Sequence, residues 1–461
     1  MHQSAVVDFV AVDELPVRLR FGVLLDRGLF GSLLLLICVT AIPYGTSQPW
    51  WKALFICFVL FATIFAVIEV MLNGGRRLEG ARLILPAVVL ILFALLQTVS
   101  LPGGNIDGLS VPAWNTISAD PYQTRFTAMQ LIALMLVILL VYRYANTDRR
   151  RRFLIHVVLA VAVTSAVYGI LRQTVQRDTG FVLPLLRPGA GYGQFINKNH
   201  FAYLMEMAFG LGLGLLAFGG VTRKHAMLYV ALLLPIWTAL VLSNSRGGIL
   251  AMAGQIVIAV LLLSYFKRSS PFGESTLLRA TQSVWMRIGL VIALILALSI
   301  GVVWVGGDRL LSNFEAVSRE FSTDPGASSG VTRNDIWRAT LKTIADHPIL
   351  GVGIGGYWIA VTEHHIASGT MTPQEAHNDY LELFASGGIV GFAIGVWFTV
   401  NAFKTIRDNL RTANRTRSAV CFASVIGLSG ALLHSFFDFG LHLMINALVF
   451  AILLALATDT A

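Results

Sequence analysis

Long apolar runs separated by short polar segments make up most of this sequence. A membrane-crossing helix needs roughly 20 mostly apolar residues, and only helices or closed barrels satisfy their backbone polar groups in lipid. The apolar runs have helix length, so the pattern predicts an all-α, polytopic membrane protein. We expect about twelve spans, at residues 28–45, 52–72, 82–101, 124–145, 153–172, 199–220, 225–243, 247–266, 285–306, 379–403, 418–436 and 441–458.

Composition and charge indicate where the protein is located and how it is oriented in the membrane. The 461 residues are 56% hydrophobic and 13% charged, which excludes an ordinary soluble domain. The net charge of +9 resides in short clusters between apolar runs, which argues against a nucleic-acid partner. With a cytoplasmic N-terminus, the cytoplasmic segments hold 22 of the 34 Lys and Arg residues. The positive-inside rule therefore predicts a multi-pass inner-membrane protein with both termini in the cytoplasm.

The predicted spans divide the chain into four parts. Residues 1–27 form a cytoplasmic N-terminal segment, 28–306 hold spans one to nine, 307–378 form a large periplasmic loop, and 379–461 hold the last three spans and a short C-terminus. Loops carry sites while spans supply the scaffold, so we expect the chemistry in the large loop. Its own predicted helix covers Thr332–Asp346, where apolar residues share one face.

His377 and Asn378 lie where the large loop returns to the membrane. A neutral imidazole at the level of the lipid headgroups suits a general base for a sugar hydroxyl, because histidine titrates near neutral pH. A histidine that merely caps a helix or an interfacial corner explains the position equally well.

Arg246 lies in a very short polar turn, Ser243–Gly248, between two apolar runs. An arginine so close to hydrocarbon is costly without an anionic partner, and no acidic residue lies nearby in the sequence. The diphosphate headgroup of a lipid is a natural partner, because guanidinium binds phosphate oxygens bidentately. Snorkelling to water from the turn is the alternative.

The predicted loop helix carries further basic residues. Arg333, at its start, is a candidate second diphosphate clamp or a partner in a structural ion pair. Arg338 and Lys342 lie on another face, where an amphipathic helix on the membrane surface is the favoured interpretation. Arg338 is retained as a candidate substrate contact.

A dense polar group marks the entry to the sixth predicted span. It consists of Asn197, Lys198, Asn199 and His200, with Arg187 upstream. Such a group at the start of a helix suits sugar hydroxyls or phosphate. An interfacial cap accounts for it equally well.

Two other patterns do not support the functions they suggest. Gly351–Gly356 fits GxGxxG, yet it follows a predicted helix instead of a strand, so we expect a flexible turn rather than a nucleotide site. His434, Asp438 and His442 recur every four residues, but Gly440 interrupts the helix and no further ligand cluster is evident. The sequence predicts no metal site and no cofactor.

Several of these stretches together resemble the O-antigen ligase and polymerase superfamily of bacterial envelope glycan assembly. The resemblance covers roughly residues 190–455 and is most specific in the large loop. It rests on Arg333–Trp337, His347–Gly353, His377–Leu381, Gly387–Gly391, Ser245–Gly247, Asn197–Ala202 and His434–Asp438.

This resemblance implies a metal-independent glycosyltransferase with a membrane fold similar to the GT-C class, acting on polyprenyl-diphosphate-linked saccharides. It implies that His377 is essential, that Arg246 binds the donor diphosphate, and that Arg333 matches a loop arginine. The acceptor stays open: a growing glycan, lipid A core or a protein hydroxyl. A transporter or flippase of lipid-linked glycans is the alternative of a different class, although the spans are nearly free of ionisable residues and show no repeat of two halves.

Overall fold

The computed structural model describes residues 17–74, 81–100, 115–175, 191–267, 333–364 and 373–460. These residues form helices, with isolated bridges but no strand among them. The long helices are α1 (Val17–Ala41), α2 (Pro49–Asn73), α3 (Ala81–Leu96), α4 (Pro121–Tyr144), α5 (Asp148–Val175), α6 (Lys198–Phe218), α7 (Arg223–Leu242), α8 (Arg246–Lys267), α13 (Asp379–Leu410), α14 (Arg415–His434) and α15 (Met444–Thr458). The shorter elements are α11 (Arg333–Asp346), α12 (Tyr357–Ala360), η3 (Val361–Glu363) and η4 (Gly440–His442).

The predicted all-helical, polytopic class is confirmed. Nine of the described helices are long and apolar enough to cross a membrane, and the shorter apolar helices α3 and α15 lie at two further predicted positions. The predicted ninth span, 285–306, lies outside the described residues. The count of twelve and the boundaries of the large loop therefore stay predictions.

Helices α6 and α14 form the centre of the bundle. The apolar windows of α6 and α14 are 72% and 67% buried, against 28–44% for the other candidate spans. Small residues bring the two backbones together: a Cβ placed on Gly214 would lie 2.5 Å from Ala423 Cα, and one on Gly427 would lie 2.7 Å from Met207 O. Close backbone approach at small residues is the usual basis of helix packing in membranes.

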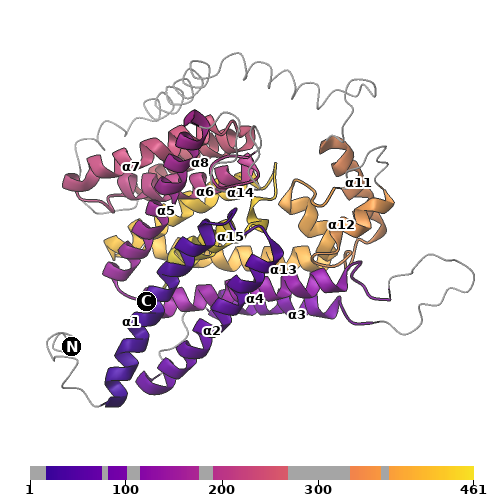
Figure 1. Cartoon of the computed structure of the whole chain (residues 1–461), viewed down its shortest axis with the longest axis horizontal. Coiled ribbons are helices and arrows are strands. Elements are labelled where there is room, and N and C mark those ends of the chain that lie inside the picture. The colour runs from indigo at the N-terminus through magenta and orange to yellow at the C-terminus, as the bar shows by residue number, and fades with distance from the viewer. Residues whose placement is uncertain are drawn as a thin grey trace, which may run out of the picture.

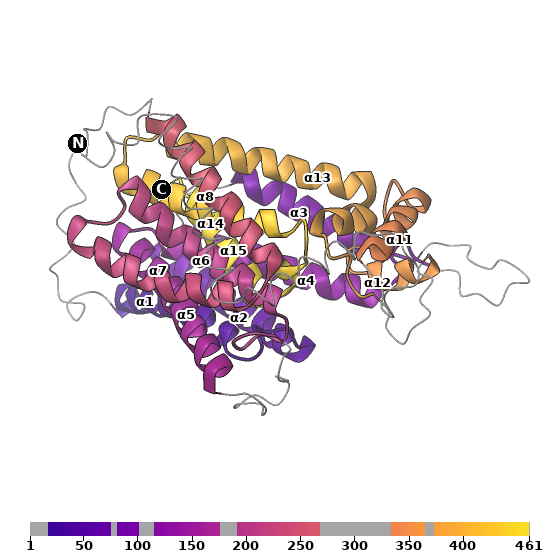
Figure 2. The same cartoon turned by 90° about the horizontal axis from the view of Figure 1, so that it is seen from above.

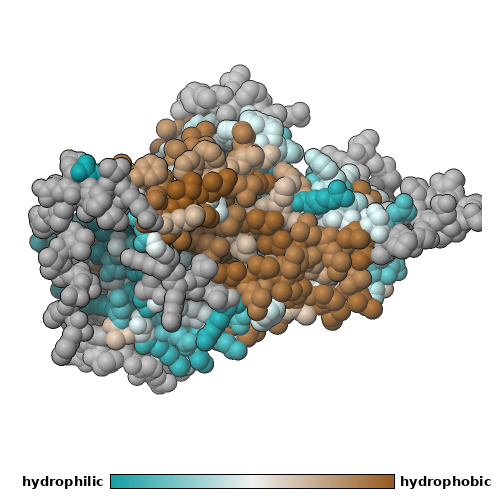
Figure 3. Space-filling view, turned by 90° about the horizontal axis from the view of Figure 1, so that it is seen from below, coloured by the Kyte–Doolittle hydropathy of each residue, from teal (hydrophilic) through white to brown (hydrophobic). Residues whose placement is uncertain are grey.

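The outer helices present apolar side chains to their surroundings. Large exposed side chains on α2 include Leu54, Phe61, Ile64 and Met71. Figure 3 shows an apolar surface across the middle of one face, with hydrophilic residues toward the ends of the molecule. This distribution suits a protein whose middle is surrounded by hydrocarbon.

One end of the bundle is held by ion pairs. Arg143 on α4 contacts Glu69 on α2 at 2.9 Å, and Arg151 on α5 contacts Asp459 at 2.6 Å. Arg150 pairs with Asp26 of α1. Arg143, Arg150 and Arg151 are three of the 22 basic residues that the predicted topology assigns to the cytoplasmic side.

Helices α11 and α12 lie together at one end of the molecule, beyond the ends of α3, α4 and α13 (Figures 1 and 2). The glycine-rich segment between α11 and α12 hydrogen-bonds to α13: Val352 N to Ala385 O and Gly353 N to Ser386 O, each at 3.0 Å. Gly388 adopts a φ of +59° and kinks α13 at this contact. A Cβ on Gly351 would clash with the Ser386 carbonyl.

The GxGxxG pattern is thus a turn that follows a helix, as predicted, but hydrogen bonds hold it on the kinked helix α13, where a flexible turn was expected. Gln97, just after α3, secures it from the side. The Gln97 side chain donates to Leu350 O at 2.7 Å and accepts from Ile354 N at 3.0 Å. The interlocked segment fixes α11 relative to α13, which begins next to His377.

Candidate functional site

Three helices begin at the site, and each has a capping side chain. Asn197 accepts from Asn199 N at 2.8 Å at the start of α6, and Ser245 accepts from Gly248 N at 3.2 Å at the start of α8. Asn378 accepts from two backbone N–H groups, each at 3.1 Å, at the start of α13. Helix N-termini present partial positive charge and favour anions.

A chain of side-chain contacts connects these starts. Ser245 Oγ donates to Asn199 Oδ1 at 2.8 Å, and the Asn199 amide donates to Asp438. The other Asp438 oxygen lies 3.3 Å from His377 Nδ1. Ser245 precedes Arg246 directly, so three contacts link the arginine turn to the loop histidine.

His377 is held in an unusual backbone conformation. Its φ is +51°, a region that residues other than glycine rarely adopt, and Asn244 in the arginine turn has a φ of +56°. Backbone strain of this kind concentrates at functional sites. The His377 ring packs edge-on against Phe439, with centroids 4.8 Å apart, and 31% of its side chain stays exposed.

Asp438 is the buried partner of this histidine. Its side chain has no exposed surface. Burial opposes its ionisation, yet the hydrogen bond with His377 and the neighbouring imidazoles of His200 and His377 lower the pKa of Asp438. An ionised Asp438 accepts the Nδ1 proton of His377 and leaves Nε2 free to accept a proton.

Two cations lie at the helix starts without acidic partners. Arg246 and Lys198 are the first residues of α8 and α6, and they are close enough to interact electrostatically. Both are half-buried. Neither side chain has a hydrogen-bond or ion-pair partner among the residues that the structure describes. Like charges brought together at two helix N-termini favour a bound anion.

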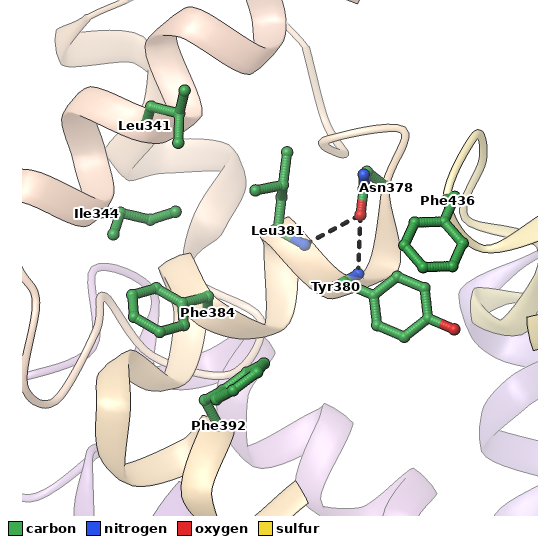
Figure 4. Close-up of a pocket in the computed structure, with 8 residues that line it drawn as sticks. All are labelled: Leu341, Ile344, Asn378, Tyr380, Leu381, Phe384, Phe392 and Phe436. Atoms are coloured by element: carbon green, nitrogen blue, oxygen red, sulfur yellow. Dashed lines mark hydrogen bonds between the residues drawn. The ribbon is translucent and has the colours of Figure 1, made fainter. Parts of the chain in front are cut away.

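An apolar cavity of about 350 Å³ lies beside Asn378. Its side chains come from α11, from α13 on both sides of the kink at Gly388, and from the turn after α14, and Figure 4 shows them around an open space. They are Leu341, Ile344, Asn378, Tyr380, Leu381, Phe384, Phe392 and Phe436. The capping amide of Asn378 is the main polar group at its edge.

The loop helix is fixed to the histidine segment. Trp337 Nε1 donates to Ala376 O at 3.0 Å, so α11 is anchored to the residue before His377. Arg333 lies one turn earlier on α11 and is half-buried, whereas Arg338 is exposed. This placement favours Arg333 over Arg338 as the group near the site.

The remaining predicted residues differ in position. Arg187 lies outside the described residues. His200 is buried, and its ring packs edge-on against Phe439 with centroids 4.8 Å apart. Asn197 and Asn378 are helix caps, and for the group at Asn197 this is the alternative left open from the sequence. Their assignment as substrate contacts stays a prediction.

The histidines and aspartate spaced every four residues do not converge. His434 contacts Glu206 on α6 at 2.8 Å, Asp438 contacts His377, and His442 contacts Glu375 at 3.2 Å. Sequence reasoning considered Asp438 only as a metal ligand and missed its role beside His377. A lone acidic residue in the short turn between two apolar runs was the available signal.

Comparison with known proteins agrees with the geometry. Residues 228–396 match the sequence model of the O-antigen ligase family. A Haemophilus influenzae protein described as uncharacterized is 28% identical over 205 residues, which cover 43% of this chain and 47% of that protein. The match thus spans about half the length of this relative. Residues 228–396, which are similar to the O-antigen ligase family, include Arg246, Arg333 and His377.

Proposed function

We propose that this protein transfers a saccharide from a polyprenyl-diphosphate-linked donor to an acceptor hydroxyl on the periplasmic face of the inner membrane. The proposal rests on Arg246 and Lys198, two cations without a side-chain partner among the described residues. They lie at two helix N-termini and are linked through Ser245, Asn199 and Asp438 to the partly exposed His377.

The transfer is a direct displacement with inversion at the anomeric carbon. Nε2 of His377 removes the proton of the acceptor hydroxyl, and the acceptor oxygen forms a bond to the anomeric carbon. The bond from that carbon to the diphosphate oxygen breaks, and the diphosphate leaves with the electron pair. Arg246, Lys198 and Arg333 stabilise its developing charge. Asp438 is a positioning residue that holds His377 in the reactive tautomer.

The donor supplies its own activation, because the periplasm contains no ATP. The apolar cavity between α11 and α13 (Figure 4) suits part of an isoprenoid chain, since hydrocarbon surface lines most of it. It lies next to Asn378, so a lipid held there places its headgroup beside His377.

Transport without bond cleavage is less well supported by the described spans. Two buried acids in these spans are engaged in structural contacts: Glu69 with Arg143, and Glu206 with His434. A charge-lined route needs groups that are available to a passing diphosphate. Two cations suited to bind an anion, Arg246 and Lys198, are linked to the candidate base His377, which favours a transferase over a transporter.

The decisive experiment follows release of polyprenyl diphosphate from a lipid-linked oligosaccharide by purified protein, without added metal. Candidate acceptors are a second lipid-linked glycan, lipid A core and a protein hydroxyl. We expect wild type to release diphosphate, and His377→Ala and Arg246→Ala to lose release while staying folded. Asp346→Asn is the matched control. Asp346 is the last residue of α11, and its exposed carboxylate contacts His364.

The acceptor that grows identifies the subclass of polymerase, ligase or protein glycosyltransferase. Binding of the lipid by wild type, with no diphosphate release in the presence of any acceptor, refutes the transferase proposal and favours transport. Unchanged release by Arg246→Ala refutes the role given to the cation pair.

A further inference from the structure

A buried pair of polar side chains lies directly behind the arginine turn. His434, the last residue of α14, contacts Glu206 of α6 at 2.8 Å, from Nδ1 to Oε1. The two side chains are 1% and 0% exposed. Burial of polar groups is costly unless they are paired, so the remaining contacts of this pair indicate what it does in the fold.

The imidazole of His434 fills the space beside Gly247. A Cβ on Gly247 would lie 2.5 Å from Nε2 and 2.7 Å from Cδ2 of His434. A Cβ on Gly248 would lie 3.1 Å from Oε1 of Glu206. The first turn of α8 therefore packs against both members of the pair, at the two residues that follow Arg246 directly.

Contacts on two sides hold the imidazole in place. Glu206 contacts its Nδ1 edge, and the Tyr203 ring stacks on its face, with centroids 4.3 Å apart and planes at 16°. The Tyr203 hydroxyl donates to the backbone oxygen of Asp438 at 3.1 Å. Nε2 faces Gly247 and has no hydrogen-bond partner among the described residues. The ring thus supports the arginine turn by its shape, not by a polar contact.

We propose that Glu206 and His434 are positioning residues that set the place of Arg246 relative to Lys198. Lys198 and Glu206 belong to α6, Arg246 begins α8, and His434 contacts both helices. This inference rests on the proposed function, because the two cations bind the donor diphosphate there. A displacement of about 1 Å at such a site lowers the rate about 100-fold, so the residue after Arg246 has to be small.

The test adds a methyl group to the turn and then removes the atoms that it meets. Gly247→Ala places a Cβ against His434, and the turn has to shift by about 1 Å to reach an ordinary contact of about 3.5 Å. His434→Asn keeps a nitrogen that donates to Glu206 but lacks the half of the ring that faces Gly247. The matched control is Gly254→Ala, two turns further along α8, whose Cβ meets the flexible end of Leu433.

Two measurements are made on the full-length protein in detergent. Equilibrium binding of farnesyl diphosphate, a soluble isoprenoid diphosphate, reports the anion site. Hydrogen exchange of residues 243–248 reports the turn itself, independently of any activity. We expect Gly247→Ala to speed exchange and to weaken binding by about tenfold or more, the effect of losing a charge-assisted hydrogen bond. Adding His434→Asn returns both quantities to near wild type, and Gly254→Ala matches wild type in both.

Recovery in the double variant also shows that the loss in Gly247→Ala is not caused by unfolding. Wild-type exchange in Gly247→Ala overturns the proposal. So does a double variant that behaves like Gly247→Ala alone, because the turn then does not rest on the ring of His434.

Arg246→Ala distinguishes this failure from a failure of the proposed function. If Arg246→Ala binds farnesyl diphosphate as wild type does, Arg246 does not hold the diphosphate and its role in the transfer is refuted. The exchange measurements then still decide the inference: faster exchange in Gly247→Ala that His434→Asn reverses supports the positioning of the turn by the pair.

Discussion

Replacing Asp438 by asparagine tests whether a buried carboxylate positions the proposed base. The Asp438 oxygen lies 3.3 Å from His377 Nδ1 and is fully shielded from solvent, while the other oxygen accepts from Asn199. Asparagine keeps the size of the side chain and removes its charge. The variant therefore separates the electrostatic role of Asp438 from its packing.

The size of the effect follows from the geometry. A hydrogen bond to a charged group contributes about 1.5–3 kcal/mol, and each 1.4 kcal/mol changes a rate about tenfold. The contact of 3.3 Å is long for a charge-assisted bond, and the His377 ring is partly exposed, which places the expected loss of kcat at about 10- to 100-fold. KM for the donor changes little, because Asp438 does not contact the donor in the proposed mechanism.

The assay is steady-state release of polyprenyl diphosphate, with Asp346→Asn as the control for loss of a carboxylate elsewhere. The His377→Ala variant gives the kcat that remains without the base. If both residues act in one step, adding Asp438→Asn to that variant lowers kcat no further. A variant Asp438→Asn with wild-type kcat refutes the positioning role. So does a rise in KM without any change in kcat, which indicates that Asp438 serves donor binding.

Three further outcomes are expected. Gly214→Ala lowers stability by about 1–3 kcal/mol, because its Cβ meets Ala423 Cα at 2.5 Å. Thermal unfolding in detergent measures this loss, whereas Gly31→Ala, with nothing within 4 Å, does not lower the melting temperature. Arg246→Lys keeps the charge but loses the bidentate fork, so donor affinity in a lipid-binding titration falls by about tenfold, and equal affinity contradicts a bidentate contact. The pKa of Asp438 is lowered in the folded protein, so its ionised form stabilises the fold fully above the unfolded pKa of about 3.9, and this contribution is lost as the pH falls further. A series of melting temperatures from neutral to acid pH shows this loss in wild type but not in Asp438→Asn.

Apolar length predicted the positions of the described spans but not their full extent. The first span was expected from residue 28 and α1 begins at Val17, while the tenth was expected to end at 403 and α13 runs to Leu410. Hydropathy detects only the part of a helix that lies in hydrocarbon, whereas the helix continues until a breaker or a cap. The last span begins later than predicted, at Met444, because Gly440–His442 forms a 3₁₀ turn.

The candidate site was predictable as separate motifs, not as an arrangement. The local sequence is enough to single out His377, Arg246 and the group at Asn197–His200. Polar residues beside hydrocarbon are costly, so each of them suggests a function. Their connection runs through Asp438, which contacts Asn199 across 239 positions and His377 across 61. Side-chain contacts between such distant turns depend on how the spans pack, which no local pattern encodes. The same holds for the contact between Glu206 and His434.

Capping and function turned out not to be competing explanations for the polar residues at the helix starts. Asn378 satisfies the first N–H groups of α13 with its side chain, and this fixes where the helix begins and thus where the strained His377 must stand. Ser245 caps α8 through Gly248 and also donates to Asn199, which leads to Asp438. In a membrane protein, backbone groups at a span's end need partners as much as a substrate does. Residues that supply those partners also hold the cations and the base at fixed separations, so loss of a cap is expected to reduce activity even where no substrate touches it.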